Sequence, residues 1–195
     1  MDLSHGHHTV DSMSSDKPTG DPDDQQGRLE ADLTGFADGD GTFSVGVTRR
    51  PELRYGFQLV PEFRVSQNPE RATILELFRE TLGCGRIREN DAHRRNDRTM
   101  VYIVRRRVDL LERVIPFFRR NPILSDKRRS FEAFETIVTA MAAGRHRDRA
   151  GFTELVELAT RMNGDGTRRK WQVSDVMGDP EPSETVRQTL IDIDE

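Results

Sequence analysis

The sequence predicts an α+β fold in which an antiparallel sheet carries helices on one of its faces. Segments that alternate apolar and polar residues follow one another across short turns, which is typical of paired strands. Segments with helical periodicity separate these pairs, in the order α-β-β-α-β-β-α with further helices behind them. A length of 195 residues suits one domain with a sizeable core.

The first half of the chain is expected to form a helix, two strands and a second helix, over residues 28–40, 43–48, 55–65 and 69–82. Gly39 and Gly41 supply the stop signal of the first helix, and Gly83 ends the second. Pro61 lies inside the second strand, where the missing N–H indicates a bulge or an edge position.

The second half is expected to contain two more strands and several helices. The strands are predicted at 86–88 and 98–105, with a polar loop at 90–97, and the helices at 107–119, 127–143 and 149–162. Ser183 and Thr185 are candidate caps of a short final helix.

Composition divides the chain into four segments. Residues 1–27 contain almost no apolar side chains and are expected to form a disordered acidic tail. Residues 28–145 form the predicted core, 146–182 a helical extension and linker, and 183–195 the short C-terminal helix or tail.

The net charge of −4 conceals a basic middle segment. Residues 33–150 carry +7, whereas residues 1–32 carry −6 and residues 151–195 carry −5. All but three of the 30 basic residues are Arg, which forms bidentate contacts with phosphate and with guanine. This pattern favours a polyanion-binding surface, although a GC-rich genome, which favours Arg codons, is an alternative source of the bias.

Several classes of protein are excluded by simple features. No run of 18 apolar residues is present, which excludes a membrane-spanning helix. The first ten residues lack the basic and apolar regions of a secretory signal, and the single cysteine, Cys84, excludes a disulfide framework and a Cys-based zinc site. We therefore expect a soluble, intracellular protein without a membrane partner.

The predicted sheet has one face rich in Arg and in hydrogen-bonding side chains. A face of this composition matches a DNA groove, although a solvated basic face is the plainer interpretation. The candidate DNA-binding residues are Ser44, Thr48, Arg50, Arg54, Gln58, Glu62, Arg64, Arg86 and Arg88.

A short motif lies where the first helix meets the first strand. Residues 33–41 read Leu-Thr-Gly-Phe-Ala-Asp-Gly-Asp-Gly, and Thr-Phe-Ser-Val follows. This resembles the LAGLIDADG motif of homing endonucleases. Further segments resemble that family in order, over about 29–143 and more weakly beyond: Phe63-Arg64-Val65-Ser66-Gln67, Leu82-Gly83-Cys84-Gly85-Arg86-Ile87, Ile115-Pro116-Phe117, Lys127-Arg128-Arg129 and Ser183-Glu184-Thr185-Val186-Arg187. The last of these is similar to the tail of the homodimeric chloroplast-intron members.

The motif contains two carboxylates at the end of a helix, where the helix dipole disfavours anions. Asp38 and Asp40 therefore suggest a metal site, and a plain turn is the alternative that we would favour outside this context. A calcium loop of the EF-hand type fails on spacing, because loop position 12 counted from Asp38 is Arg49 instead of Glu. The resemblance implies a metal site at Asp40 and Gly39, with Asp40 as the catalytic acid.

The small residues of the first helix recur at a helical spacing. Ala31, Gly35 and Gly39 fall at i, i+4 and i+8 on one face, where their size permits close approach of a second helix. Because one carboxylate can hardly organise phosphodiester hydrolysis, and the sequence has one such motif, we expect a homodimer in which two copies of Asp40 converge. The expected interface residues are Ala31, Thr34, Gly35, Asp38 and Gly39. Thr34 replaces the usual Ala of the family.

Three further site residues follow from the resemblance alone. Gln67 matches the glutamine that orients water in the active site, and Arg71 matches a basic residue of the same pocket. Lys127 matches the lysine that polarises solvent or stabilises charge on the phosphate, and Arg128 is the alternative, because the alignment crosses a length difference just before it. An ordinary surface residue at a helix end is the plainer interpretation of each.

Together these features predict a homing endonuclease that hydrolyses both strands of a long, pseudo-palindromic DNA target with Mg²⁺, for which Mn²⁺ substitutes. The resemblance implies an αββαββα core with a saddle-shaped antiparallel sheet. The expected partners are double-stranded DNA and a second copy of the chain, with no small-molecule substrate. A prokaryotic cytoplasm or, for an intron-encoded member, an organelle is the expected location. An RNA-splicing maturase or a DNA-binding regulator that does not cleave is the alternative.

Overall fold

A four-stranded antiparallel sheet forms the centre of the structure, a computed structural model that describes residues 22–90, 98–162, 174 and 176. Its strands are β1 (Gly41–Arg49), β2 (Phe57–Gln67), β3 (Arg86–Glu89) and β4 (Met100–Val104), in the spatial order β1-β2-β4-β3. The helix-strand-strand order repeats twice, as predicted, and all three strand pairs are antiparallel.

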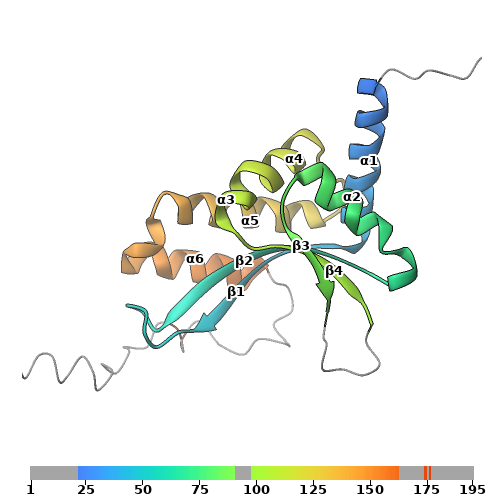
Figure 1. Cartoon of the computed structure of the whole chain (residues 1–195). Coiled ribbons are helices and arrows are strands. Elements are labelled where there is room, and N and C mark those ends of the chain that lie inside the picture. The colour runs from blue at the N-terminus through green and yellow to red at the C-terminus, as the bar shows by residue number, and fades with distance from the viewer. Residues whose placement is uncertain (1–21, 91–97, 163–173, 175, 177–195) are drawn as a thin grey trace, which may run out of the picture.

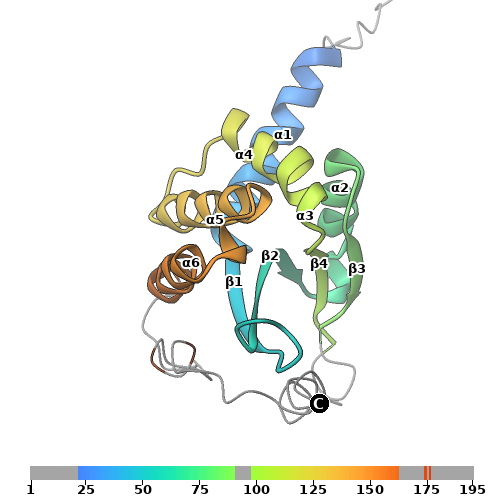
Figure 2. The same cartoon turned by 90° about the vertical axis from the view of Figure 1, so that its left-hand side faces the viewer.

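The helices cover one face of this sheet, and none of the described helices lies over the opposite face, which we call the open face (Figure 1). They are α1 (Pro22–Asp40), α2 (Thr73–Leu82), α3 (Arg107–Asp109), α4 (Ile115–Arg120), α5 (Lys127–Ala142) and α6 (Arg149–Met162). A π-helical turn, Leu110–Val114, joins α3 to α4, so the predicted helix at 107–119 is confirmed as one continuous segment. In Figure 2, α5 and α6 lie over the β1 side, and α2 lies over the β3 and β4 side.

Alternation along the strands decides which face is buried. Phe43 and Val45 on β1, and Leu59, Phe63 and Val65 on β2, point toward the helices and are buried, as the sequence predicts. Aromatic rings then join the sheet to the helices: the Phe43 ring centroid lies 5.0 Å from those of Phe63 and Phe118. These contacts make the α1–β1 junction part of a rigid core.

The turn from α2 into β3 is fixed by a glycine. Gly85 has φ +79°, and a Cβ atom there would lie 2.6 Å from the ring of Tyr102. The Tyr102 hydroxyl donates to the Cys84 carbonyl oxygen at 3.0 Å, and burial raises the pKa of the Cys84 thiol. This contact fixes where β3 enters the sheet.

The tip of the β1–β2 hairpin packs against α6. Tyr55, which the sequence places in the second strand, lies in the turn before β2, and its ring stacks on Phe152 at 5.1 Å. Its hydroxyl donates to the Arg147 carbonyl oxygen at 3.0 Å. The register from Gly41↔Val65 to Arg49↔Phe57 contains no bulge, and Pro61 lies where β2 pairs with β1 alone, so the edge position is confirmed.

Helix α1 begins earlier than the sequence suggests. The prediction of a disordered tail over residues 1–27 is wrong for residues 22–27, which are helical. Pro22 suits the first helical position, and Asp23 and Asp24 complement the dipole in the first turn. The rest of the tail, most of the loop at 90–97, the linker at 163–182 apart from residues 174 and 176, and the predicted final helix at 183–195 lie outside the described residues.

Within the described ranges, none of the helices combines the length and the apolar character that a membrane span requires.

Candidate active site and nucleic-acid interface

The junction between α1 and β1 positions the two carboxylates of the motif. Helix α1 ends at Asp40, and β1 begins at the next residue, Gly41. A Cβ atom at Gly41 would lie 2.5 Å from the carbonyl oxygen of Ala37, so only glycine permits this tight passage from helix to strand. The sequence therefore holds Asp40 at the edge of the open sheet face.

Asp38 is bound to the segment that precedes α5. Its carboxylate accepts hydrogen bonds from the backbone N–H groups of Leu124 and Ser125, at 3.1 and 3.0 Å, and from the Ser125 hydroxyl. The Ser125 hydrogen bond is the main reason that the pKa of Asp38 lies below its ordinary value. Asp38 therefore joins α1 to α5 within one chain, and its predicted place in the dimer interface stays a prediction.

Lys127 caps the C-terminal end of α1. Its ammonium donates to the carbonyl oxygens of Ala37 and Gly39, at 3.0 and 2.9 Å, which is a favourable place for a cation. Burial lowers the pKa of Lys127, and the charges of Asp38 and Asp40 oppose that shift. Arg128 instead pairs with Glu132 at 2.9 Å on the exposed side of α5, so Lys127 is the base that lies beside the motif.

Asp40 differs from Asp38 in having no hydrogen-bond or ion-pair partner among the described residues, and its side chain is exposed. Lys127 is the charge that acts on it. In the described part of the chain, no group of three or more His, Cys, Asp or Glu residues is placed to hold a metal ion. Asp40 is therefore an exposed carboxylate with the Lys127 ammonium near it.

Gln67 and Arg71 lie near this corner but do not contact Asp40. Gln67 ends β2, beyond the Gly41↔Val65 pair at the start of β1, and its side-chain oxygen accepts from the Asn68 N–H at 2.8 Å. Arg71 is exposed at the end of the short 3-10 turn Pro69–Arg71. No hydrogen bond or ion pair links either residue to Asp40 within the described ranges, so their predicted roles in the pocket stay predictions.

One face of α1 is open to solvent and lined by small residues. Ala31, Gly35 and Gly39 are exposed, and a Cβ atom at either glycine would meet nothing within 4 Å. Thr34 is buried and donates to the Glu30 carbonyl oxygen at 2.8 Å, so its predicted place on this face is wrong. Helix geometry explains the difference, because Thr34 lies next to Leu33 and Ala37 on the core side.

The open sheet face carries most of the predicted DNA-binding residues. By alternation with the buried positions, this face presents Ser44, Thr48, Gln58, Glu62, Arg64, Arg86 and Arg88. Arg64 and Arg86 pair with opposite sides of Ile103 on β4. Ile103 and Val101 belong to this face and are nonetheless buried, so long polar side chains cover β4 here.

The two remaining candidates, Arg50 and Arg54, lie in the turn between β1 and β2. Arg50 is exposed, and its Nη1 lies 3.7 Å from the Glu52 Oε1. Arg54 donates to the Arg147 carbonyl oxygen at 3.5 Å and lines a cavity of about 450 Å³ together with Tyr55 and Phe152. It therefore points toward the helical side of the hairpin, and its predicted place on the open face is wrong.

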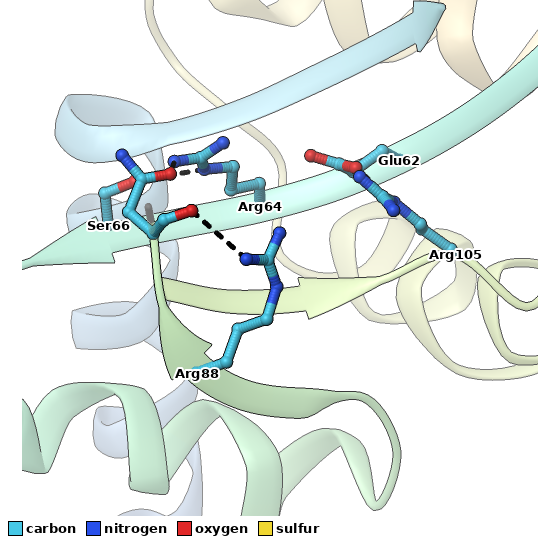
Figure 3. Close-up of polar contacts among 6 residues, drawn as sticks. Glu62, Arg64, Ser66, Arg88 and Arg105 are labelled. Carbon is cyan, nitrogen blue, oxygen red and sulfur yellow. Dashed lines mark hydrogen bonds and ion pairs between the residues drawn. The ribbon is translucent and has the colours of Figure 1, made fainter. Parts of the chain in front are cut away.

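Three polar residues of these sites were missed in the sequence. Ser125 holds Asp38, Asn90 accepts a hydrogen bond from Arg64, and Arg105 pairs with Glu62 at 2.5 Å (Figure 3). Ser125 immediately precedes Asp126 and a helical segment, which is a signal typical of a helix start. Asn90 lies just past the end of β3, where no periodic pattern marks its face. Arg105 ends the predicted strand at 98–105, whose alternation indicates its face but not its partner Glu62.

Comparisons with known proteins show similarity to one family. Residues 33–138 match the family described as LAGLIDADG endonuclease. The DNA endonuclease I-CeuI of Chlamydomonas moewusii is 30% identical over 88 residues, which are 45% of this chain and 39% of that protein.

Two groups of solved structures are similar to the whole fold. The archaeal intron-encoded homing endonuclease I-Vdi141I, complexed with DNA, is 28% identical with a TM-score of 0.68, over 80% of this chain and 94% of that one. I-SmaMI bound to an uncleaved DNA target in the presence of calcium ions is 27% identical with a TM-score of 0.63, over 67% of this chain and 43% of that one. The chain spans between 31% and 39% of the full length of three curated relatives.

Proposed function

Because the chain belongs to the LAGLIDADG endonuclease family, we propose that it is a site-specific DNA endonuclease that depends on a divalent metal ion and works as a homodimer. The observation that carries this proposal is the contrast at the end of α1, where Asp38 is fully hydrogen-bonded and Asp40 has no such partner among the described residues. An exposed carboxylate on the negative end of a helix dipole is costly unless a cation offsets it.

The donors at this corner suit a hard divalent cation. The Asp40 carboxylate would hold it, and oxygen ligands are those that Mg²⁺ and Mn²⁺ prefer. The Gly39 carbonyl oxygen, which accepts from the Lys127 ammonium at 2.9 Å, would offer the ion its second lone pair. When bound, the ion would activate water and stabilise charge on the scissile phosphate. The calcium ions of the similar I-SmaMI complex support a divalent ion in this role.

A second copy of the chain would complete the centre. Glycine in a helix interior costs roughly 0.5–1 kcal/mol relative to alanine, yet neither Gly35 nor Gly39 is required by packing inside this chain. Their exposed face suits close contact with a second α1, and a two-fold axis along that contact brings the two Asp40 residues together.

Lys127 places a positive charge near Asp40. Its ammonium is fixed beside Asp40 by two carbonyl oxygens, and burial lowers its pKa. We assign to Lys127 the stabilisation of charge that develops on the phosphate. Gln67 and Arg71 would orient water and contact phosphate once DNA is bound, as the family resemblance implies.

The open face would lie in the major groove on either side of the cleaved bonds. Its residues include the hydrogen-bonding and basic side chains that distinguish base pairs there, such as Arg64, Arg86 and Gln58. A symmetric dimer predicts a pseudo-palindromic target, because each subunit presents the same face to one half-site.

Cleavage of a randomised duplex library with Mg²⁺, followed by sequencing of the cut ends, tests this function. The expected result is one pseudo-palindromic consensus that is cut on both strands by the wild type and by Asp126→Asn, and left uncut by Asp40→Asn. Asp126 is an exposed control on the same side of the molecule. Selection of a consensus by binding alone, with no cut by any of the three proteins, would instead support a maturase or a non-cleaving regulator.

A further inference from the structure

Arg64 is held on the open sheet face by two neutral side chains. Its Nε donates to the Ser66 hydroxyl at 3.3 Å, and its Nη2 donates to the side-chain oxygen of Asn90 (Figure 3). Ser66 lies on β2, and Asn90 directly follows β3, with β4 between these strands. The Arg64 side chain therefore reaches Ser66 along its own strand, and its bond to Asn90 links β2 to the end of β3 across β4, so both ends of its Nε–Nη2 edge are anchored.

The position of Arg64 lies away from the rim of the sheet. Residues 63–65 of β2 pair with β1 on one side and with β4 on the other, so Arg64 lies in the interior of the face. Phosphates of a DNA duplex lie at the borders of a groove, and base edges form its floor. A side chain in the interior of this face is therefore placed to meet base edges, whereas the side chains at the tip of the β1–β2 hairpin are placed to meet phosphates.

Two neighbouring arginines on the same face are held differently. Arg105 donates to the Glu62 carboxylate at 2.5 Å, which neutralises its charge. Arg88 donates from Nη1 to the carbonyl oxygens of Glu89 and Asn90, at 3.0 and 3.1 Å. Its Nε is buried and has no partner among the described residues. Arg64 keeps its full charge, because hydroxyl and amide partners do not neutralise it.

The bonds of Arg64 also determine which of its donors remain. A guanidinium has five N–H groups, and Ser66 and Asn90 occupy the edge formed by Nε and Nη2. No other described residue accepts from Arg64, so both N–H groups of Nη1 and the second of Nη2 remain, and these form the end-on edge of the guanidinium. Two parallel donors on such an edge match the O6 and N7 acceptors of guanine, the base that arginine reads most often in the major groove.

We infer that Arg64 reads a guanine in each half-site of the DNA target, and that Asn90 is the positioning residue that sets this preference by holding Arg64 across β4. The inference rests on the proposed function, because it requires that the open face binds DNA. It goes beyond that function by naming one base of the unknown target and the residue pair that selects it.

The test selects bound duplexes from a randomised library, in the Asp40→Asn background so that no cutting depletes them. The parent protein is expected to prefer guanine at one position of each half-site by roughly tenfold or more. Arg64→Ala should remove this preference, and Asn90→Ala should reduce it severalfold at that position alone. Gln58→Ala is the matched control, because Gln58 lies on the same face and strand near the far end, and it should leave that position unchanged.

A double-mutant cycle separates positioning from structural support. Asn90→Ala should have no further effect on the guanine preference once Arg64 is Ala, because the effect acts through Arg64. A structural role would instead lower the melting temperature and weaken binding to all sequences equally in both backgrounds. Ser66→Ala is a second variant, which removes the other anchor and should also lower the preference.

The outcomes distinguish the inference from the function it rests on. A parent protein that selects no sequence at all would contradict the proposed function. A consensus that keeps its guanine in Arg64→Ala would overturn the inference and leave the function intact. A uniform loss of affinity in Arg64→Ala, with a shallower dependence on salt, would show a phosphate contact instead of base reading and would also overturn it.

Discussion

The corner where α1 meets α5 and the open sheet face are both rich in charge, but they hold their charges by different means. At the corner, backbone groups fix the side chains: Asp38 accepts from two N–H groups and a hydroxyl, and Lys127 donates to two carbonyl oxygens. On the face, the side chains of Ser66 and Asn90 hold Arg64, and Glu62 pairs with Arg105, whereas Arg88 donates to two backbone carbonyl oxygens (Figure 3).

This difference has a consequence for function. Geometry set by the backbone does not change when a neighbouring side chain is replaced, so the corner suits a reaction that is the same at every target. Geometry set by side chains can be changed one residue at a time, so the face suits recognition of a particular sequence. Asp40 is the exception at the corner, since it has no hydrogen-bond partner inside the described chain.

The largest effect on cleavage is expected from a substitution that blocks the contact between α1 and a second subunit. Gly35→Leu places a bulky side chain on the exposed face of α1, where it meets nothing within the chain but blocks a second helix. We expect a folded monomer that has lost cleavage, with a melting temperature no lower than that of the wild-type subunit, because leucine favours helix. Analytical ultracentrifugation and thermal unfolding measure both properties. A Gly35→Leu dimer with normal cleavage would contradict this account of α1.

The next effect concerns the lysine of the corner. Lys127→Met keeps much of the length and packing of the side chain but removes the ammonium beside Asp40, and the cleavage rate of the bound target should fall by roughly 10²-fold. Lys127→Arg should restore little activity, because a guanidinium does not shift its pKa as an ammonium does. Single-turnover kinetics measure the rate. If Arg128→Met, the exposed neighbour that pairs with Glu132, were the more harmful change, the assignment of Lys127 would be wrong.

Asp38→Asn should act on stability before chemistry. The loss of a charged acceptor for three hydrogen bonds at a half-exposed site should cost about 1–2 kcal/mol of the free energy of unfolding. Since the pKa of Asp38 is lowered on folding, its contribution is present above its ordinary value of 3.8 and is lost as pH falls through the lower folded value. Denaturant unfolding of both proteins between pH 3 and pH 7 should show the difference shrinking at the acidic end. A difference in unfolding free energy between the two proteins that does not change with pH would contradict this role of the Asp38 carboxylate.

The smallest effect is expected on the sheet face. Glu62→Gln removes the ion pair with Arg105, whose side chain is 48% exposed, and should change stability by less than about 1 kcal/mol. It should alter DNA selection more than stability, because it leaves the charge of Arg105 unpaired. Library selection and thermal unfolding, measured together, test this. A loss of stability as large as that of Asp38→Asn would show that the two regions are not held differently.

Much of the fold could be predicted because it depends on local patterns. The alternation of Phe43 and Val45 with Ser44 and Gly46 gives the strand and its buried face directly, and the glycine after α2 gives its end. The start of α1 was missed because residues 22–27 have the composition of a tail. Their helical support comes from the position of Pro22 and from the pair between Asp24 and Arg28, which are weak signals in a sequence.

The candidate site could be predicted only as far as the motif extends. Asp38 was placed on the dimer face because the spacing of α1 is local, whereas its partner Ser125 lies 87 residues away in the sequence. The choice between Lys127 and Arg128 likewise depends on how α5 is rotated about its axis. The sequence pattern does not fix that rotation to within one residue, so it does not show which of the two side chains faces α1. Arg54 was assigned to the open face by extending the strand pattern into a turn that the packing of Tyr55 on Phe152 redirects.

The central claim is that Asp40 of each copy contributes to a shared centre, and mixing subunits tests it most directly. Wild-type and Asp40→Asn chains are co-refolded in varied ratios at constant total concentration, and the rate of double-strand cleavage is measured on the selected target. If both copies of Asp40 are required for each cut, a mixed dimer should cut neither strand, and nicking and double-strand cleavage should both follow the square of the wild-type fraction, to about one quarter in an equal mixture. A rate of single-strand cutting that falls in simple proportion, to about one half, would show that each Asp40 cuts alone and would contradict the claim.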